Sequence, residues 1–162
     1  MCRFAVWLGN NDVHNTFLTS TLDNLENDVR EYAALLDVLY QTGARNFLIL
    51  NVPPFDRSPM LAGRDPALIP LMEDTVAAYN KNLTKAIDYF GESHANTTVF
   101  QFDAHSLFSE ILDWPCSHEA TCAVQDTFTF CRAYQHEKEN PYRFNRRCQY
   151  SLDKYFWLNS LQ

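Results

Sequence analysis

A polar turn directly after the first apolar segment of the chain holds the residues best suited to chemistry. Residues 4–8 are apolar and predict a buried strand, which ends at Gly9, Asn10, Asn11 and Asp12. An asparagine amide placed just past a strand donates N–H bonds to an anionic oxygen, and such a preorganised donor contributes about 3 to 4 kcal/mol to acyl transfer. Gly9 allows a sharp backbone turn, and Asp12 can hold that turn by accepting backbone N–H groups. The same residue types also fit an asparagine-rich turn without a catalytic role.

Acyl transfer also requires a nucleophile with a base within hydrogen-bond reach. The chain contains no Gly-x-Ser-x-Gly segment. His14 could line the cleft but is interpreted as a surface loop histidine, and His105 is interpreted as a solvent-facing histidine beside a helix cap. Cys2 has no base next to it and is interpreted as a leftover thiol or as the former partner of a segment that this chain lacks. The serines are assigned to ordinary loop, cap or helix-face positions: Ser58, Ser93, Ser106 and Ser109.

Apolar spacing predicts the elements that position these residues. Steps of four and three residues, starting at Leu18, predict one helix of about six turns that Thr19 or Ser20 caps and Gly43 ends. Residues 47–52 are apolar on both faces and precede two prolines, so they predict a buried parallel strand. The stripe of the helix consists of Leu18, Leu22, Leu25, Val29, Tyr32, Leu36 and Leu39.

In the second half of the chain, helices and strands are again predicted to alternate. A second amphipathic helix is predicted from Leu68 to Phe90, with Gly91 as its end, followed by a strand at 98–102. Asp103 is expected to cap a short helix. Strands that alternate with helices at this spacing predict an α/β fold with a parallel sheet.

Ligands of such folds bind beyond the carboxyl ends of the strands. We therefore expect the turns at 9–12, 51–54 and 103–105 to lie along one edge of the sheet. A length of 162 residues predicts a single domain, 1–162.

The composition of the chain excludes some classes of binding partner. The formal net charge of −7 and the lack of a basic run argue against nucleic acid. The short patch at 143–147, with three arginines, is interpreted as a solvated loop. No apolar run reaches the ~20 residues that span a bilayer. The absence of a Gly-rich phosphate loop argues against a flavin or nucleotide domain.

Cysteines and sequons indicate an oxidising compartment. Cys116, Cys122, Cys131 and Cys148 lie in an irregular segment and predict two disulfides, with three connectivities open. A zinc site of Cys116, His118 and Cys122 is the less favoured alternative, because no Cys-x-x-Cys pair is present. Sequons at residues 82–84 and 96–98 agree with export. We expect a secreted protein whose leader is absent from this chain.

Five segments together resemble the GDSL (SGNH) hydrolases, and more narrowly the secreted acetylesterases grouped with carbohydrate esterases. They lie at residues 6–12, 43–54, 79–83, 102–108 and 155–161. The resemblance implies a flavodoxin-like three-layer sandwich and hydrolysis of short-chain or carbohydrate esters by a serine and a histidine. It implies that the side chain of Asn11 belongs to the oxyanion hole, and it implies no cofactor or metal.

The chain departs from that family's pattern at both ends. The blocks that hold the serine and a glycine donor would precede Met1, Asn159 stands where the last block has Asp, and Gln162 stands where it has His. We therefore expect a partial fold whose first strands are missing, little activity of this chain alone, and a monomer if it folds. The alternative is a non-catalytic secreted protein that binds glycans or esters.

Overall fold

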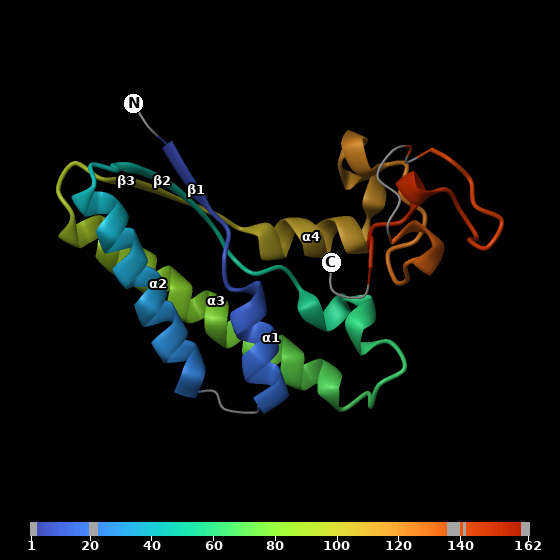
Figure 1. The fold of residues 1–162 in the computed structure, drawn as a ribbon, viewed down its shortest axis with the longest axis horizontal. Helices are drawn as coiled ribbons and strands as arrows, with labels where there is room; N and C mark the ends of the chain where they lie inside the picture. Colours follow the sequence, from blue (N-terminus) through green and yellow to red (C-terminus); the bar gives the residue numbers. More distant parts are fainter. Residues whose placement is uncertain (1–2, 20–22, 136–139, 141, 160–162) are drawn as a thin grey trace. The chain divides into compact units, whose positions relative to one another are not determined.

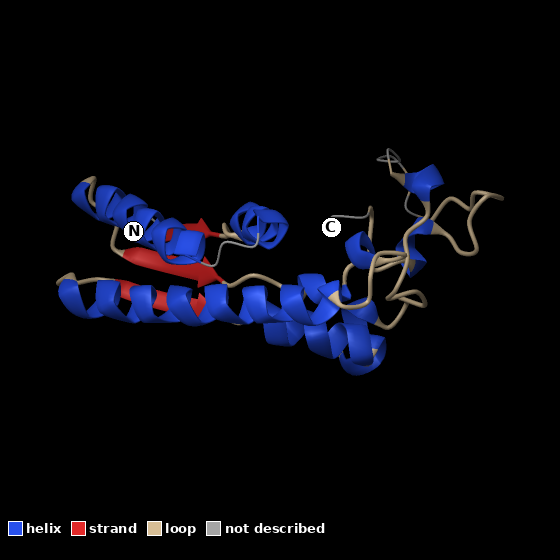
Figure 2. Ribbon diagram, turned by 90° about the horizontal axis from the view of Figure 1, so that it is seen from below, coloured by secondary structure: helices blue, strands red, loops and turns tan. Residues whose placement is uncertain are grey.

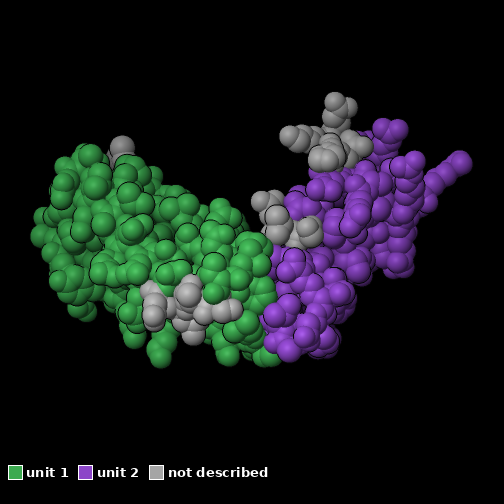
Figure 3. All heavy atoms as spheres, turned by 60° about the horizontal axis from the view of Figure 1, so that its bottom comes forward, with its two compact units in different colours: residues 1–53, 70–105 green, residues 54–69, 106–162 purple. Residues whose placement is uncertain are grey.

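The computed structural model describes residues 3–19, 23–135, 140 and 142–159. The chain forms two compact units, shown in different colours in Figure 3. The first comprises residues 1–53 and 70–105, and the second comprises residues 54–69 and 106–162. Each unit is described by itself below.

A parallel three-stranded sheet organises the first unit. Strands β1 (Arg3–Val6), β2 (Asn46–Leu50) and β3 (Thr98–Phe102) lie in the order β1-β2-β3. Ala5 pairs with Leu48, which in turn pairs with Phe100. The described helices are α1 (Asn10–Thr19), α2 (Asp23–Gln41), α3 (Leu68–Ser93) and α4 (Ala104–Asp113). The predicted α/β fold with a parallel sheet is confirmed.

Helices α2 and α3 lie on the same side of the sheet (Figures 1 and 2). Phe47 and Ile49 of β2 point to that side and are buried, and the ring of Phe47 meets the ring of Phe90 of α3 edge to face at 5.3 Å. On the opposite side, Leu48 is 40% exposed and Phe100 is 63% exposed. The prediction that both faces of the second strand are buried is therefore wrong for the described residues, which form two of the expected three layers.

The single long helix predicted from Leu18 is two helices. Helix α1 ends at Thr19, whose hydroxyl donates to the carbonyl of Asn15 at 3.0 Å, and α2 begins at Asp23. Leu18 is 57% exposed, so it does not belong to the buried stripe. A predicted cap at Ser20 and the stripe position Leu22 fall outside the described residues.

The glycine at the end of α2 behaves as predicted. Gly43 has φ +102°, its N–H bonds to the carbonyl of Tyr40, and the N–H of Ala44 bonds to the carbonyl of Leu39. This pair of bonds is the Schellman arrangement that a glycine in the left-handed region permits. Gly91, by contrast, does not end α3, because the helix continues to Ser93.

The first strand is shorter than predicted. It ends at Val6, and Trp7 and Leu8 are 45% and 51% exposed, so they belong to the connection into α1. The third strand has its predicted limits, and α4 follows Asp103 directly, as expected. No described helix is long and apolar enough to cross a membrane.

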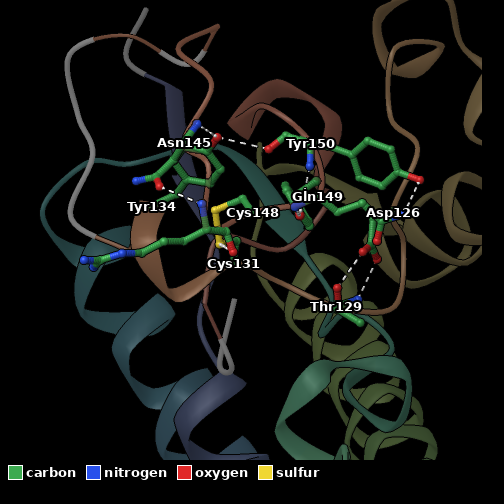
Figure 4. Close-up of a disulfide and its surroundings, with 10 residues drawn as sticks. Asp126, Thr129, Cys131, Tyr134, Asn145, Cys148, Gln149 and Tyr150 are labelled. Atoms are coloured by element: carbon green, nitrogen blue, oxygen red, sulfur yellow. Dashed lines mark hydrogen bonds between the residues drawn. A yellow bond between two sulfur atoms is a disulfide. The ribbon is translucent and has the colours of Figure 1, made fainter.

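Disulfides and short 3-10 turns hold the second unit together. Cys116 pairs with Cys122, and Cys131 pairs with Cys148, so two disulfides form as predicted. The first bridge uses both cysteines of the alternative zinc site, and no metal-binding group of His, Cys, Asp and Glu occurs among the described residues. Cys148 of the second bridge belongs to a small apolar cluster with Tyr134 and Tyr155. Figure 4 shows this bridge and Tyr134.

Candidate active site

The carboxyl edge of the sheet brings three polar segments to one side of the first unit. The connection after β1 leads to Asn11, the end of β2 leads to Asn51, and the end of β3 leads to Asp103. Because the strands are parallel neighbours, their carboxyl ends share one edge. The predicted edge at residues 9–12, 51–54 and 103–105 is therefore present.

Asn51 links the ends of the second and third strands. It is buried, its Nδ2 donates to Asp103 Oδ1 at 2.9 Å, and its Oδ1 accepts the N–H of His105 at 2.9 Å. The second bond satisfies one of the free N–H groups in the first turn of α4, as a helix cap does. Both polar atoms of the Asn51 side chain are thereby used in holding the edge.

The backbone of the same turn is fixed from two further sides. Trp7 Nε1 donates to the carbonyl of Asn51 at 3.1 Å. Asn80 of α3 brackets Val52: its Oδ1 accepts the Val52 N–H and its Nδ2 donates to the Val52 carbonyl, each at 2.9 Å. This two-bond pairing satisfies a backbone that has left the sheet at the point where a proline pair follows.

Gly9 allows the chain to turn closely over α3. It has φ +114°, and a Cβ at this position would lie 2.5 Å from the buried ring of Tyr79. The Gly9 carbonyl accepts the N–H of Val13 at 2.9 Å, which starts helix α1. Only a residue without a side chain combines this backbone conformation with this contact.

Asn11 lies in the first turn of α1 and is exposed. The neighbouring Asn10 differs, since its Oδ1 is buried and has no hydrogen-bond partner among the described residues. Asp12 follows in the same turn, where a carboxylate is favoured by the positive end of the helix dipole. Asn11 is thus the more exposed residue of the pair.

Buried polar groups below the turn carry shifted pKa values. Burial raises the pKa of Tyr79, and the charges of Asp12 and Asp28 and the nearby Tyr32 add to the shift. Burial also raises the pKa of Asp28, followed by the charges of Asp12 and Glu31. The hydroxyls of Tyr79 and Tyr32 are buried without partners among the described residues. Burial and the neighbouring carboxylates therefore make the charged forms of Tyr79 and Asp28 less favourable than they are in water.

The candidate bases are placed differently from one another. His14 lies on α1, partly buried and three residues after Asn11, so the interpretation as a loop histidine is wrong. His105 is the second residue of α4, next to the capping position as predicted. Neither imidazole ring forms a hydrogen bond within the described part of the chain. Residues three apart on a helix share a face, so His14 and Asn11 do so.

The serines keep structural positions. The Ser58 hydroxyl donates to the carbonyl of Phe55 at 2.8 Å, and that of Ser93 donates to the carbonyl of Tyr89. Ser106 and Ser109 lie on α4, as expected for cap and helix-face residues. Cys2 lies outside the described residues.

Three residues of this site were missed in the sequence: Trp7, Tyr79 and Asn80. The apolar segment 4–8 predicts only that Trp7 belongs to a strand, and the periodicity between Leu68 and Phe90 predicts only that Tyr79 lies on the buried face of its helix. Asn80 carried a signal, because a polar residue beside the buried stripe of a helix needs a nearby polar partner. What the sequence did not show is which backbone segment α3 would meet.

Comparison with known proteins identifies the family of this chain. Residues 3–135 match the family of GDSL-like lipases and acylhydrolases. An acetylesterase of Thermothelomyces thermophilus is 34% identical over 128 residues, covering 76% of this chain and 42% of that protein. A GDSL esterase/lipase of Arabidopsis thaliana is 22% identical over 127 residues, covering 70% of this chain and 35% of the plant protein. The chain thus spans less than half the length of either relative. Because the family match extends over most of its residues, the chain belongs to the GDSL-like lipase and acylhydrolase family.

Proposed function

We propose that this chain carries the oxyanion-hole asparagine, Asn11, of an acetylesterase that acts on short-chain or carbohydrate esters. The observation that carries the proposal is the position of Asn11. It is the exposed amide of the first turn of α1, at the carboxyl edge of a parallel sheet. The family match and the acetylesterase relative support ester chemistry for this edge.

Asn11 acts at the step where charge develops. When a serine hydroxyl adds to an ester carbonyl and gives its proton to a histidine, the carbonyl π bond opens and its oxygen becomes an anion. Asn11 Nδ2–H donates a hydrogen bond to this oxygen. An amide held in place before the reaction stabilises this anion without reorganising at the transition state. The Gly9 turn against Tyr79 and the Trp7 bond to Asn51 support this preorganisation, because both fix the connection that leads into Asn11.

The 162-residue chain has no nucleophile and base of its own in this proposal. The hydroxyls of Ser58 and Ser93 are bonded to backbone carbonyls rather than to a histidine. Asn159 and Gln162 occupy the positions where the family resemblance places an aspartate and a histidine. The chain therefore hydrolyses esters no faster than its buffer does.

Release of p-nitrophenol from p-nitrophenyl acetate tests this statement. The rate with purified chain is expected to equal the rate with heat-denatured chain at the same concentration. Catalytic turnover by the folded chain, lost in Asn11→Ala and kept in the matched surface variant Asn15→Ala, would show that a complete site exists and would overturn the proposed inactivity.

The proposal places residues 1–162 in one domain whose sheet is larger in the active enzyme. Parallel sheets occur almost only with both faces covered. Here Leu48 and Phe100, which are neighbours in register, are both exposed on the same face. A covering layer of helices on this face would remove that exposed apolar area from water.

Export of the protein is part of the same proposal. Two disulfides agree with an oxidising compartment. Of the two sequon asparagines, Asn96 is exposed at a turn with φ +60°, whereas Asn82 is partly buried on α3. We therefore assign glycan attachment to Asn96 first. The folded chain is taken to be a monomer.

A further inference from the structure

The second unit contains a basic segment within an acidic protein. Residues 130–150 hold five Lys or Arg residues and two Glu residues, while the whole chain has a formal net charge of −7. The segment includes the patch at 143–147 that the sequence alone suggested to be a solvated loop. A local field of opposite sign to the rest of the protein attracts anions to this region.

A pocket of about 490 Å³ lies beside the Cys131–Cys148 disulfide. Its walls include Arg132, Arg147, Gln149 and Tyr155. The disulfide joins the two stretches of chain that carry the arginines, so both walls are held covalently. A volume of this size lies in the range of small-molecule sites, roughly 300 to 1,000 Å³.

Both arginines are available to a ligand. Arg132 and Arg147 are exposed, and neither guanidinium has an ion pair or hydrogen bond within the described residues. A guanidinium matches the geometry of a carboxylate with two parallel N–H bonds, which a point charge such as Lys does not. Two guanidinium groups in the wall of one pocket favour an anionic ligand that has oxygen acceptors.

Tyr155, another residue of the pocket wall, carries a hydroxyl group whose proton is unused within the described part of the chain. The residue is 7% exposed, and its hydroxyl oxygen accepts the N–H of Gln149 at 3.1 Å and the N–H of Tyr150 at 3.3 Å. The hydroxyl proton has no acceptor among the described residues, so it is free to donate. The Gln149 side chain gives its Nε2 to the Tyr150 hydroxyl at 2.9 Å, which leaves its Oε1 as an acceptor.

We propose that this pocket, which we call the arginine pocket (Arg132, Arg147, Gln149, Tyr155 and the disulfide), binds a hexuronate, a sugar ring that carries one carboxylate. The arginines bind the carboxylate. The Tyr155 hydroxyl and the Gln149 Oε1 form hydrogen bonds with ring hydroxyls, and the Tyr155 ring and the disulfide contact the apolar face of the sugar. A lone carboxylate or phosphate would use the arginines only and would leave the rest of the pocket unused.

Titration of the whole chain with sodium glucuronate at low salt tests the proposal, with amide chemical shifts as the readout. We expect saturable shifts in the 130–155 segment and a dissociation constant on the order of 1 mM, since both arginines remain in contact with water. Arg132→Gln with Arg147→Gln is expected to weaken binding at least tenfold, because hydrogen bonds to charged groups are lost. The matched double variant Arg64→Gln with Arg143→Gln removes two exposed arginines outside the pocket and is expected to bind as the original chain does.

Three further ligands separate charge from sugar recognition. Glucose, sodium acetate and inorganic phosphate are each expected to bind at least about tenfold more weakly than glucuronate. Equal binding of any of them, binding that survives the pocket substitutions, or no saturable binding of glucuronate would overturn the proposal. The readout involves no ester hydrolysis, so its outcome does not depend on the proposed function of Asn11.

Discussion

The indole N–H of Trp7 donates a hydrogen bond of 3.1 Å to the backbone carbonyl of Asn51. The two residues are 44 positions apart and belong to the connections that follow β1 and β2. This bond connects the segment that leads into Asn11 to Asn51. The side chain of Asn51 in turn bonds to Asp103 and to the first turn of α4. The carboxyl edge of the sheet is therefore one connected hydrogen-bonded structure rather than three independent turns.

Replacement of Trp7 by Phe is expected to destabilise the fold by about 1 kcal/mol, because a ring remains while the N–H donor is lost. The value is at the low end for a buried bond, since Trp7 is 45% exposed. Urea unfolding followed by circular dichroism measures the change. Trp114→Phe is the control. Trp114 is 74% exposed, so its replacement is expected to change the urea midpoint little. Equal effects of the two substitutions would contradict a specific role of the Trp7 bond.

Gly9→Ala is expected to cost at least about 2 kcal/mol, because it combines backbone strain with overpacking. An alanine would keep a φ near +114°, and its Cβ would lie 2.5 Å from the ring of Tyr79, which is fully buried. Gly63→Ala is the matched control, since Gly63 also has a positive φ but has open space around it. The difference between the two midpoints in urea isolates the contact with Tyr79. A Gly9 variant as stable as the Gly63 variant would show that the turn does not rest on that ring.

The order of elements follows from local sequence, and the interactions between distant segments do not. Gly43 was predictable as the end of α2, because a helix periodicity that stops at a glycine has few alternatives. The break between α1 and α2 was not, because Leu18 has the right spacing for the stripe and only the packed structure shows it exposed. The pairing of Cys131 with Cys148 was one of three possibilities, since spacing alone does not determine which thiols meet.

In the candidate site, too, local sequence predicts some residues but not their contacts with distant segments. Asn11 was predicted from the Gly-Asn-Asn-Asp turn together with a family resemblance, and the turn lies at the expected edge. Asn51 was predicted as part of a turn, but its role as a link to Asp103 depends on a residue 52 positions away. Asn80 is 28 positions from the segment it brackets. No local pattern contains such distances, so they appear only when the strands and α3 are assembled.

A carboxylate in the second unit makes stability depend on pH. Burial of Asp126 raises its pKa, but hydrogen bonds from the Thr129 hydroxyl and from the N–H groups of Thr129 and Phe128 outweigh burial and lower the pKa below its usual value. Figure 4 shows Asp126 with Thr129. An aspartate in the unfolded chain has a pKa of about 4, and the folded chain lowers the pKa of Asp126 below that value. The charge of Asp126 therefore stabilises the fold above about pH 4, and this stabilisation is lost as the pH falls through the pKa of the folded chain.

Asp126→Asn is therefore expected to destabilise the chain at pH 7 by on the order of 1 kcal/mol or less, since the carboxylate is partly exposed to solvent. At pH 3 the difference between the variant and the original chain is expected to shrink. Urea midpoints at the two pH values provide the comparison. A difference that stays constant or grows on acidification would show that the charge of Asp126 does not stabilise this turn.

The claim that Asn11 is an oxyanion donor is tested most directly in a chimera in which residues 3–135 replace the matching segment of the Thermothelomyces thermophilus acetylesterase. We propose that the rest of that enzyme supplies the serine and the histidine. With p-nitrophenyl acetate, Asn11→Ala is expected to lower kcat by about 10²- to 10³-fold with little change in KM, because the lost bond exists mainly in the transition state. Asn15→Ala, on the same helix, is expected to leave kcat unchanged. A chimera that has no activity before substitution, or one whose kcat is the same with Asn11 and with Ala at that position, would contradict the account.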